Sequence, residues 1–263
     1  MSETLLQANA DTGTLGKLMG LLDIVALSEQ PMRFTDILDI AGQPRGTLHR
    51  QLSHMVQEGL LDIDRDGRYR PGIRLLTFAA RSWAGNDFRR IAEPHLSQLH
   101  EQTGETVHLG VLNDLQVIYL DKVEGRQAVR MYSHIGNAAP AYCTGVGKAA
   151  LSTLDDASLQ ARVARIKFVA FTTRTHRTAA SLLAEIDAIR TEGCAFDREE
   201  HEDGICCVAA AIPPVGSRAA SGLSVTGPAY RVTPGKLREW APLVRAAAAA
   251  IEMDIAIRLS PRS

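Results

Sequence analysis

The 263-residue sequence has no run of about 18 apolar residues, so we predict no membrane-spanning helix. It also has no basic segment followed by an apolar stretch near its start, so we expect no secretory signal. No segment repeats at the period of a solenoid protein. It has four cysteines, none of them in C-x-x-C spacing, and the vicinal pair Cys206-Cys207 is poor disulfide geometry. We therefore expect a reduced, cytoplasmic protein with no metal or other cofactor.

The formal net charge is only −1, which argues against a protein that coats nucleic acid indiscriminately. A local basic surface remains compatible with this balance. Hydrophobic residues make up 45% of the chain and charged residues 22%, which is enough apolar material for a packed core. The length fits one large domain or two modest ones.

The first part of the chain has the spacing of three successive helices. Apolar residues over 15–25 recur at helical intervals. A second short helix follows with Thr35 as its N-cap, and Gly42 ends it. A third helix is expected over residues 44–58, since proline suits a first helical turn and a glycine follows its end.

A charged hairpin comes directly after the third helix. Asp66-Gly67 lies between short alternating segments, and Asp-Gly is the strongest short signal for a β-hairpin. The order helix, helix, turn, helix and two-stranded wing is typical of a winged helix-turn-helix domain. A further helix is expected over 73–84, and a hinge at 85–87. We therefore place a first domain, with its linker helix, over residues 1–86.

Residues 87–263 have a different character, because alternating strand patterns are mixed with helices. Expected strands cover 107–112, 116–123, 128–133, 206–212 and 221–227. Expected helices cover 88–103 and 182–191, and others start at Gly145 and near Pro234. This pattern predicts an α+β or α/β domain with a central, mostly antiparallel sheet.

The outward face of the third helix is polar and carries no acidic residue before Glu58. Its inward face holds Leu48, Leu52, Met55 and Val56. An ordinary solvated face would also be polar, but such faces usually mix acidic and basic residues. The winged context favours a helix that reads the major groove, with the wing on phosphates or the minor groove. The candidate DNA contacts are Thr35, Arg45, Gly46, Thr47, His49, Arg50, Ser53, His54, Arg68 and Arg70.

Two stretches of the second half have the chemistry of a small-molecule site. Thr144 is a good N-cap, and the glycines that follow would let an anion approach the first free N–H groups of a helix. A tight strand-to-helix turn without a ligand explains the same residues. Ser224 and Thr226 are two apart on a strand, so both hydroxyls point to one face. The P-loop pattern G-x-x-x-x-G-K-[ST] is absent.

Cys206 and Cys207 also alternate on a strand, so we expect only one of them to face inward. A small buried wall is the commonest role of a free cysteine. A redox or metal sensor is an alternative, as is a hydrolytic enzyme that uses the cysteines with Lys148 and Asp197. The sequence marks no nucleophile–base pair, so we do not expect an enzyme.

The chain resembles the IclR family of bacterial transcriptional regulators over about residues 14–255. The matching motifs in the first half are PRGTLHRQL, EGLL and DGRYRPG. Those in the second half are TGETVHLGVL, VIYLDKVEG, APAYCTGVGKAAL, EEHEDGICCVAAAI and SGLSVTGP, in the family's usual order. One departure is AAAIPP, where many relatives have AAP and then a short acidic turn.

The resemblance implies an α+β protein with an N-terminal winged helix-turn-helix domain, a linker helix and a C-terminal GAF-like α/β effector domain over 87–263. It implies a repressor that binds double-stranded operator DNA as a homodimer or homotetramer, away from membranes. Its effector would be a small organic acid, which we expect to be a keto acid or a hydroxylated, sugar-derived acid of a catabolic pathway. The implied effector contacts are Met131, Ala139, Gly145, Val146, Asp197, Cys207, Ser224 and Thr226.

Overall fold

The computed structural model describes residues 13–126, 133–214 and 218–259. The chain forms two units, residues 1–85 and 86–263. The boundary between them along the sequence lies within 85–87, the segment expected to be a hinge. In the described ranges, no helix has both the length and the apolar character needed to cross a lipid bilayer.

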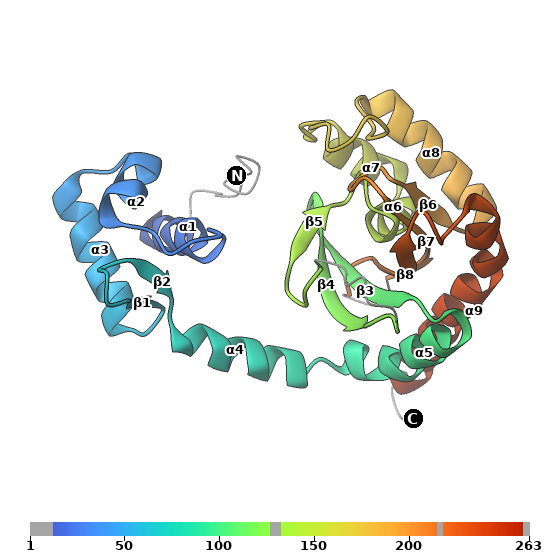
Figure 1. The fold of residues 1–263 in the computed structure, drawn as a ribbon, viewed down its shortest axis with the longest axis horizontal. Coiled ribbons are helices and arrows are strands. Elements are labelled where there is room, and N and C mark those ends of the chain that lie inside the picture. The colour runs from blue at the N-terminus through green and yellow to red at the C-terminus, as the bar shows by residue number, and fades with distance from the viewer. Residues whose placement is uncertain (1–12, 127–132, 215–217, 260–263) are drawn as a thin grey trace. The chain divides into compact units, whose positions relative to one another are not determined.

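The first unit consists of helices and one small hairpin, in the predicted order (Figure 1). The elements are α1 (Gly13–Ala26), α2 (Phe34–Ala41), α3 (Arg45–Gln57), β1 (Leu61–Ile63), β2 (Tyr69–Pro71) and α4 (Ile73–Ala84). Its core includes Leu21, Ile37, Leu48 and Leu52, each at most 1% exposed. Gly42 ends α2 in the left-handed region with φ 61°, and its N–H donates to the Leu38 carbonyl at 3.1 Å.

The start of α2 differs from the prediction. Residue 33, not Thr35, occupies the N-cap position, so Thr35 lies inside the first turn. The carboxylate of Asp36 accepts a hydrogen bond from the Arg33 N–H at 2.9 Å. The carboxylate of a first-turn residue therefore caps the helix, in place of the hydroxyl group that we expected. Thr35 was predicted as the N-cap only because threonine is common at that position.

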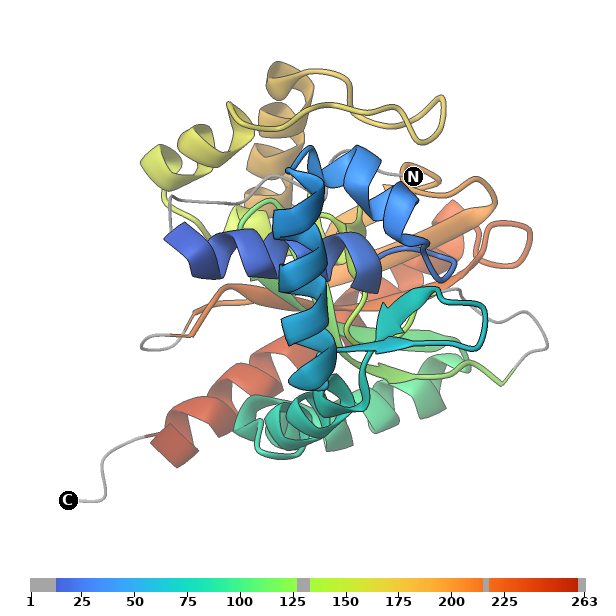
Figure 2. The same ribbon diagram turned by 90° about the vertical axis from the view of Figure 1, so that its left-hand side faces the viewer.

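The predicted hairpin is present as β1 and β2, which pair antiparallel with Asp62 opposite Arg70. The Asp64 carboxylate accepts from the N–H groups of Asp66 and Arg68, both at 2.9 Å. These bonds close the loop around Gly67, whose φ is 73°. Figure 2 looks onto this unit, where the hairpin lies beside the C-terminal end of α3.

The second unit is built on one six-stranded sheet with the order β5-β4-β3-β8-β7-β6, in which all neighbours are antiparallel. The strands are β3 (Thr106–Asn113), β4 (Gln116–Val123), β5 (Ala138–Pro140), β6 (Ala195–Arg198), β7 (Ile205–Ile212) and β8 (Ser221–Pro228). The helices are α5 (Asp87–Thr103), α6 (Gly145–Ser152), α7 (Asp156–Val163), α8 (Ala179–Glu192) and α9 (Pro234–Leu259).

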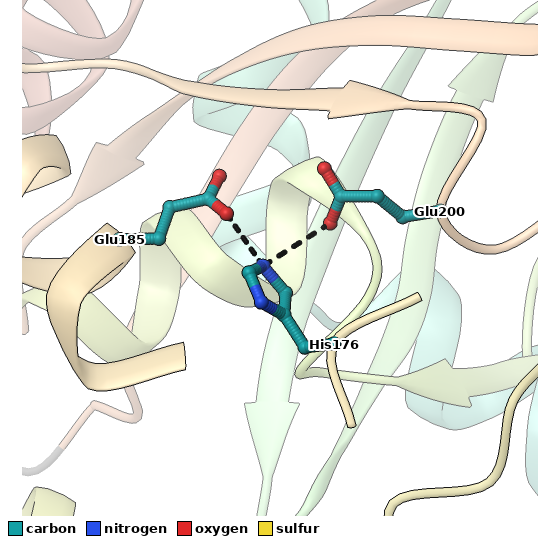
Figure 3. A group of neighbouring side chains, drawn as sticks. All are labelled: His176, Glu185 and Glu200. Carbon is teal, nitrogen blue, oxygen red and sulfur yellow. Dashed lines mark hydrogen bonds and ion pairs between the residues drawn. The ribbon is translucent and has the colours of Figure 1, made fainter. Parts of the chain in front are cut away.

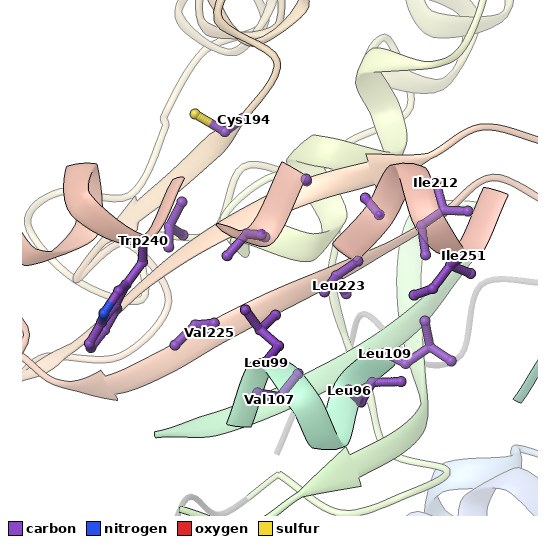
Figure 4. Close-up of a cluster of buried hydrophobic side chains, with 14 of the residues drawn as sticks. Leu96, Leu99, Val107, Leu109, Cys194, Ile212, Leu223, Val225, Trp240 and Ile251 are labelled. Atoms are coloured by element: carbon purple, nitrogen blue, oxygen red, sulfur yellow. The ribbon is translucent and has the colours of Figure 1, made fainter. Parts of the chain in front are cut away.

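Helices cover both faces of this sheet (Figure 1). On one face α5 and α9 bury Leu99, Val225 and Trp240 in the larger core (Figure 4). On the other face α6, α7 and α8 bury a second cluster that includes Val146 and Ile186. The fold is therefore the predicted one, a winged helix-turn-helix unit followed by an α/β unit.

The two covered faces correct one expectation about the vicinal cysteines. Cys206 is 7% exposed on the α5–α9 face and Cys207 is 5% exposed on the opposite face. Both are buried, because each face of the sheet has its own helical layer. Strands β5 and β6 and helix α7 were not predicted at all, and most of the strand expected over 128–133 lies outside the described residues.

Candidate functional site

The third helix presents the predicted polar face to solvent. Leu48, Leu52 and Met55 are buried against the rest of the unit. Arg45, Gly46, His49, Arg50 and His54 are exposed, and Thr47 and Ser53 are partly exposed. A Cβ built on Gly46 would meet no atom within 4 Å, so this part of α3 is open to close approach. The arrangement suits the entry of a helix into a groove.

A hollow lies between α2, the start of α3 and the wing. It is lined by Arg33, Phe34, Thr35, Arg45, His49, Asp66, Gly67 and Tyr69. The guanidinium of Arg45 stacks over the Phe34 ring, 5.0 Å from its centroid. The exposed guanidinium of Arg33 forms no ion pair with any residue in the described ranges. Sequence reasoning missed Arg33, although its place just before α2 was a usable signal.

The two predicted wing arginines have partners within the unit. The Arg70 side chain donates to the Asp62 carboxylate across the hairpin, at 2.5 and 3.0 Å. These hydrogen bonds lower the pKa of Asp62. Arg68 donates to the Pro31 carbonyl at 3.3 Å. Asp62 therefore holds two of the donor nitrogens of Arg70, whose Nη1 has no hydrogen bond to the Asp62 carboxylate.

A cavity of 170 Å³ opens in the second unit, between the sheet and the N-terminal end of α6. It is lined by His108, Tyr119, Ser133, Asn137, Ala138, Ala139, Thr144, Gly145, Val146, Asp197, His201, Glu202, Ile205, Cys207, Ser224 and Thr226. Seven of the eight residues expected at an effector site are in this set; the eighth, Met131, lies outside the described residues.

The first turn of α6 packs tightly against the residues beside it. Thr144 is the N-cap, as predicted, and its hydroxyl accepts from the Gly147 N–H at 3.3 Å. A Cβ on Gly145 would lie 2.4 Å from the Cys207 Sγ, and one on Gly147 would lie 2.4 Å from the Ala141 backbone. The glycines are therefore required for packing of helix against strand, whether or not an anion binds at Gly145 and Val146.

Hydroxyl groups line the opposite wall of the cavity. Ser224 and Thr226 share a face, as expected, with their oxygens 3.2 Å apart. His108 joins them to Ser133: its Nδ1 lies 3.2 Å from Thr226 Oγ1 and its Nε2 lies 2.7 Å from Ser133 Oγ. Burial, followed by the charge of Lys122, lowers the pKa of His108 to about 3. The ring is neutral at physiological pH, so one nitrogen donates and the other accepts.

Sequence reasoning missed His108 and its neighbour Tyr119. The alternation of β3 places His108 on the face away from Val107 and Leu109, and this was a usable signal. The Tyr119 ring lies 5.0 Å from the His108 ring. Burial raises the pKa of the Tyr119 phenol, which keeps it as a hydrogen-bond donor.

Asp197 is the least expected wall residue for an anion site. It is 6% exposed and accepts a hydrogen bond from the Glu200 N–H at 2.7 Å. Burial and the charge of Glu200 raise the pKa of Asp197 to about 7. At neutral pH the group therefore stands between acid and carboxylate.

Behind the cavity wall, Lys148 of α6 is fully buried between two glutamates. Its ammonium donates to Glu185 Oε1 and to the Phe196 carbonyl, both at 2.7 Å, and to Glu200 Oε2. His176 lies 2.5 Å from the second oxygen of Glu185 and 3.6 Å from Glu200 (Figure 3). Together, His176, Glu185 and Glu200 have a geometry that could hold a metal ion, but the ammonium of Lys148 already occupies the space between the carboxylates.

The four cysteines are buried free thiols. Burial raises the pKa of Cys206 to about 11, and it raises the pKa values of Cys143, Cys194 and Cys207 as well. Thiolates are the reactive form, so none of these side chains has the environment of a nucleophile or a redox sensor.

Comparisons with known proteins cover both units of the chain. The IclR helix-turn-helix domain matches residues 14–65, and the bacterial transcriptional regulator IclR C-terminal domain matches residues 81–253. The HTH-type transcriptional regulator XynR of Escherichia coli (strain K12) is 31% identical over 218 residues, which cover 82% of this chain and 86% of the relative. The acetate operon repressor of Salmonella typhimurium is 32% identical over 231 residues, which cover 87% and 84%.

One crystal structure of similar fold holds a small acid. It is an IclR homolog from Microbacterium hydrocarbonoxydans complexed with 4-hydroxybenzoate, with a TM-score of 0.76 and 21% identity, covering 93% of this chain and all of that one. The two family matches and the two curated relatives cover both units of the chain. The protein belongs to the IclR family of bacterial transcriptional regulators, and it is a DNA-binding regulator, not an enzyme.

Proposed function

We propose that this regulator is a repressor that releases or rearranges on its operator when a small organic acid enters the cavity of the second unit. The observation that carries the proposal is the cavity itself. Residues that are remote in sequence, such as Ala139, Asp197 and Thr226, converge on one hollow of 170 Å³ at a helix N-terminus. The regulator would act in the cytoplasm, where its operator lies.

On the DNA side, α3 supplies Arg45, Thr47, His49, Arg50, Ser53 and His54, with Gly46 allowing close approach and Thr35 at the start of α2. The wing supplies Arg68 and Arg70. We assign base reading to α3 and phosphate contact to the wing, because a helix fits the major groove and a hairpin reaches the flanking backbone.

The size and lining of the cavity support a compact acid. An apolar cavity of about 150 Å³ holds a benzene molecule, so 170 Å³ suits a ligand of about six to ten heavy atoms. The hydroxyls of Ser224 and Thr226 and the phenol of Tyr119 suit a ligand with a hydroxyl or keto oxygen besides its carboxylate. The bound 4-hydroxybenzoate of the Microbacterium homolog is one acid of this size. We favour a keto acid or a hydroxylated, sugar-derived acid.

An exposed apolar face of α4 supports self-association. Ile73 is 76% exposed, Leu76 65% and Trp83 38%, and no residue of α4 is buried. A second copy of the chain is the occupant we assign to this face, which gives a homodimer with two DNA-reading heads. A homotetramer is two such dimers.

A ligand screen followed by a DNA-binding assay tests the function. Thermal unfolding of the purified protein is measured with pyruvate, lactate, gluconate and 4-hydroxybenzoate, each beside its amide. A ligand of the native state raises the Tm. Each acid that raises it is then added to a gel shift on the DNA upstream of the protein's own gene. An acid that raises the Tm and weakens or alters the gel shift supports the proposal.

The other outcomes separate its parts. If the protein binds DNA specifically but none of the organic acids affects it, the effector assignment is overturned and the DNA-binding function stands. An acid that raises the Tm but leaves the gel shift unchanged overturns the link between the two sites.

A further inference from the structure

The cavity has an unusual charge balance for a site that takes an anion. Among the described residues that line it there is no lysine or arginine, while Asp197 and Glu202 are both acidic. Its two histidines do not supply a positive charge, because burial lowers the pKa of His108 to about 3 and also lowers the pKa of His201. A ligand carboxylate would therefore meet backbone N–H groups and hydroxyls, together with the carboxyl group of Asp197.

From α6, the positive charge of Lys148 lowers the pKa of Asp197, but the ammonium group of Lys148 already donates its hydrogen bonds to other groups. An ammonium group has three donors. All three are used, on Glu185, Glu200 and the Phe196 carbonyl. None remains to donate to Asp197 or to a ligand, and the charge of Lys148 is balanced by two glutamates before Asp197 is counted.

The groups facing Asp197 from the surrounding elements disfavour its ionised form. Glu200 contributes a like charge from the β6–β7 turn, and Cys207 on β7 and Tyr119 on β4 are neutral. Cys143, just before α6, is also neutral. The backbone N–H groups of Glu200 and His201 and the charge of Lys148 oppose this effect. A ligand carboxylate would add another negative charge, and two carboxyl groups in one desolvated site share a proton in preference to ionising together.

We propose that Asp197 meets the effector as an uncharged carboxylic acid and donates a hydrogen bond to the effector's carboxylate. The two carboxyl groups then hold one proton between them, so each acid that binds to ionised Asp197 takes up one proton. The inference rests on the proposed function, whose ligand it describes. It explains why a buried aspartate lines an anion site, and it makes Asp197 a residue that selects carboxylates over ammonium compounds. Affinity for an acid then falls about tenfold per pH unit once Asp197 ionises, near pH 7.

The protonation of Asp197 can be measured without any ligand. The full-length protein and its Asp197→Asn variant are unfolded in urea at intervals from pH 5 to pH 8. An aspartate that is ionised in the unfolded chain but protonated in the fold loses stability as pH rises between its two pKa values. The wild-type folding constant should therefore fall relative to that of Asp197→Asn by roughly 50-fold between pH 5 and pH 7, and by roughly a further twofold up to pH 8.

A matched control is Asp203→Asn, which changes an exposed aspartate in the following turn. Its ratio to wild type should stay constant across the same range. A constant ratio for Asp197→Asn as well would mean that Asp197 is ionised in the folded protein, which would overturn the inference whatever the ligand proves to be.

Calorimetric titration with 4-hydroxybenzoate and with pyruvate tests the coupling itself. At pH 8, in two buffers of different ionisation enthalpy, binding to the wild type should take up close to one proton. The wild-type Kd should rise by roughly tenfold from pH 6 to pH 8, whereas the Kd of Asp197→Asn should stay flat. A flat wild-type profile overturns the inference. An acid that binds with proton uptake but does not affect DNA binding overturns only the proposed function.

Discussion

Gly145 packs so closely against Cys207 that a Cβ on residue 145 would lie 2.4 Å from the Cys207 Sγ. We expect Gly145→Ala to lower the free energy of unfolding by about 1–3 kcal/mol, because α6 or β7 must move to admit the methyl group. Urea unfolding monitored by circular dichroism measures the loss. In the double variant Gly145→Ala, Cys207→Ala, most of it should return, since the obstructing sulfur is gone.

Gly46→Ala is the matched control for this substitution. Nothing lies within 4 Å of a Cβ at that position in α3, and alanine favours a helix over glycine. Its stability should rise by about 0.5–1 kcal/mol. A Gly145→Ala protein as stable as Gly46→Ala would show that the contact with Cys207 is looser than the structure has it.

Lys148→Met should destabilise the second unit strongly. The substitution removes the ammonium that joins Glu185 and Glu200, and leaves the buried carboxylate of Glu200 and the partly buried carboxylate of Glu185 without it. Breaking a buried ion pair from one side costs about 3–5 kcal/mol. Lys167→Met, at an exposed position, should change stability by less than about 0.5 kcal/mol. Equal unfolding curves for the two variants would contradict the buried network.

The same network predicts an acid-sensitive part of the stability. Burial opposes the effect, but hydrogen bonds from His176 and Lys148 lower the pKa of Glu185 to about 2, from 4.5. A carboxyl group whose pKa is lower in the folded state than in the unfolded state stabilises the fold at pH values above its unfolded-state pKa. That stability is lost as the pH falls towards its folded-state pKa. We therefore expect a loss on the order of 3 kcal/mol between about pH 5 and pH 2.

Comparison of Glu185→Gln with wild type isolates this part. The variant should be less stable at pH 6, and the gap should close as the pH is lowered. Glu192→Gln, which changes an exposed glutamate at the end of α8, should follow the wild-type curve throughout. A gap between Glu185→Gln and wild type that is independent of pH would assign the effect to packing.

Arg50→Ala should weaken operator binding with little effect on folding, because Arg50 is exposed on α3. We expect a loss of about 1–3 kcal/mol per head, measured by fluorescence anisotropy on operator DNA. If Arg50 contacts phosphate, the slope of log affinity against log salt concentration should also become shallower by about one, because one fewer counterion is released on binding. Arg238→Ala removes the same charge from an exposed position on α9 and serves as the control. Unchanged operator affinity in Arg50→Ala would contradict the assignment of α3 as the helix that reads the DNA.

Ser224→Ala should weaken effector binding and leave DNA binding intact. Its hydroxyl lines the cavity and lies 3.2 Å from Thr226 Oγ1. Loss of one hydrogen bond to the ligand corresponds to about 0.5–1.5 kcal/mol, which calorimetry with an acid found in the screen can resolve. Ser221→Ala is a close control, since Ser221 is buried on the same strand but donates to the Ile212 carbonyl away from the cavity. Full affinity in Ser224→Ala would place the ligand elsewhere.

The winged unit could be predicted almost element by element, because its signals are local. Gly42 and the Asp66-Gly67 turn fix where helix and hairpin end, and the helix expected over 73–84 is α4. The N-cap at Thr35 failed because Asp36 supplies the capping carboxylate from within the turn. Residue type alone does not distinguish the two arrangements.

The sheet of the second unit could be predicted only in part. Strands β5 and β6 are three and four residues long and are defined by their pairing with distant strands, so no local periodicity reveals them. His108 reaches Thr226 across 118 residues of sequence, and only the antiparallel register brings the two together. Ala139 and Asp197 were assigned to the cavity from family resemblance, since no spacing in the sequence relates one to the other. Both vicinal cysteines are buried for a similar reason, since the second helical layer is a property of the tertiary fold.

Three of the cavity residues lie side by side across the sheet, since Asp197 is opposite Cys207 and Cys207 is opposite Thr226. Their neighbours along each strand, such as Val208 and Val225, point into the core under α5 and α9. The pleat thus assigns alternate positions of the same strands to two separate surfaces, the wall of the cavity and the hydrophobic core. The side chains of one row can therefore be exchanged, and the shape and chemistry of the cavity changed, while the residues that hold the sheet to its helices stay as they are.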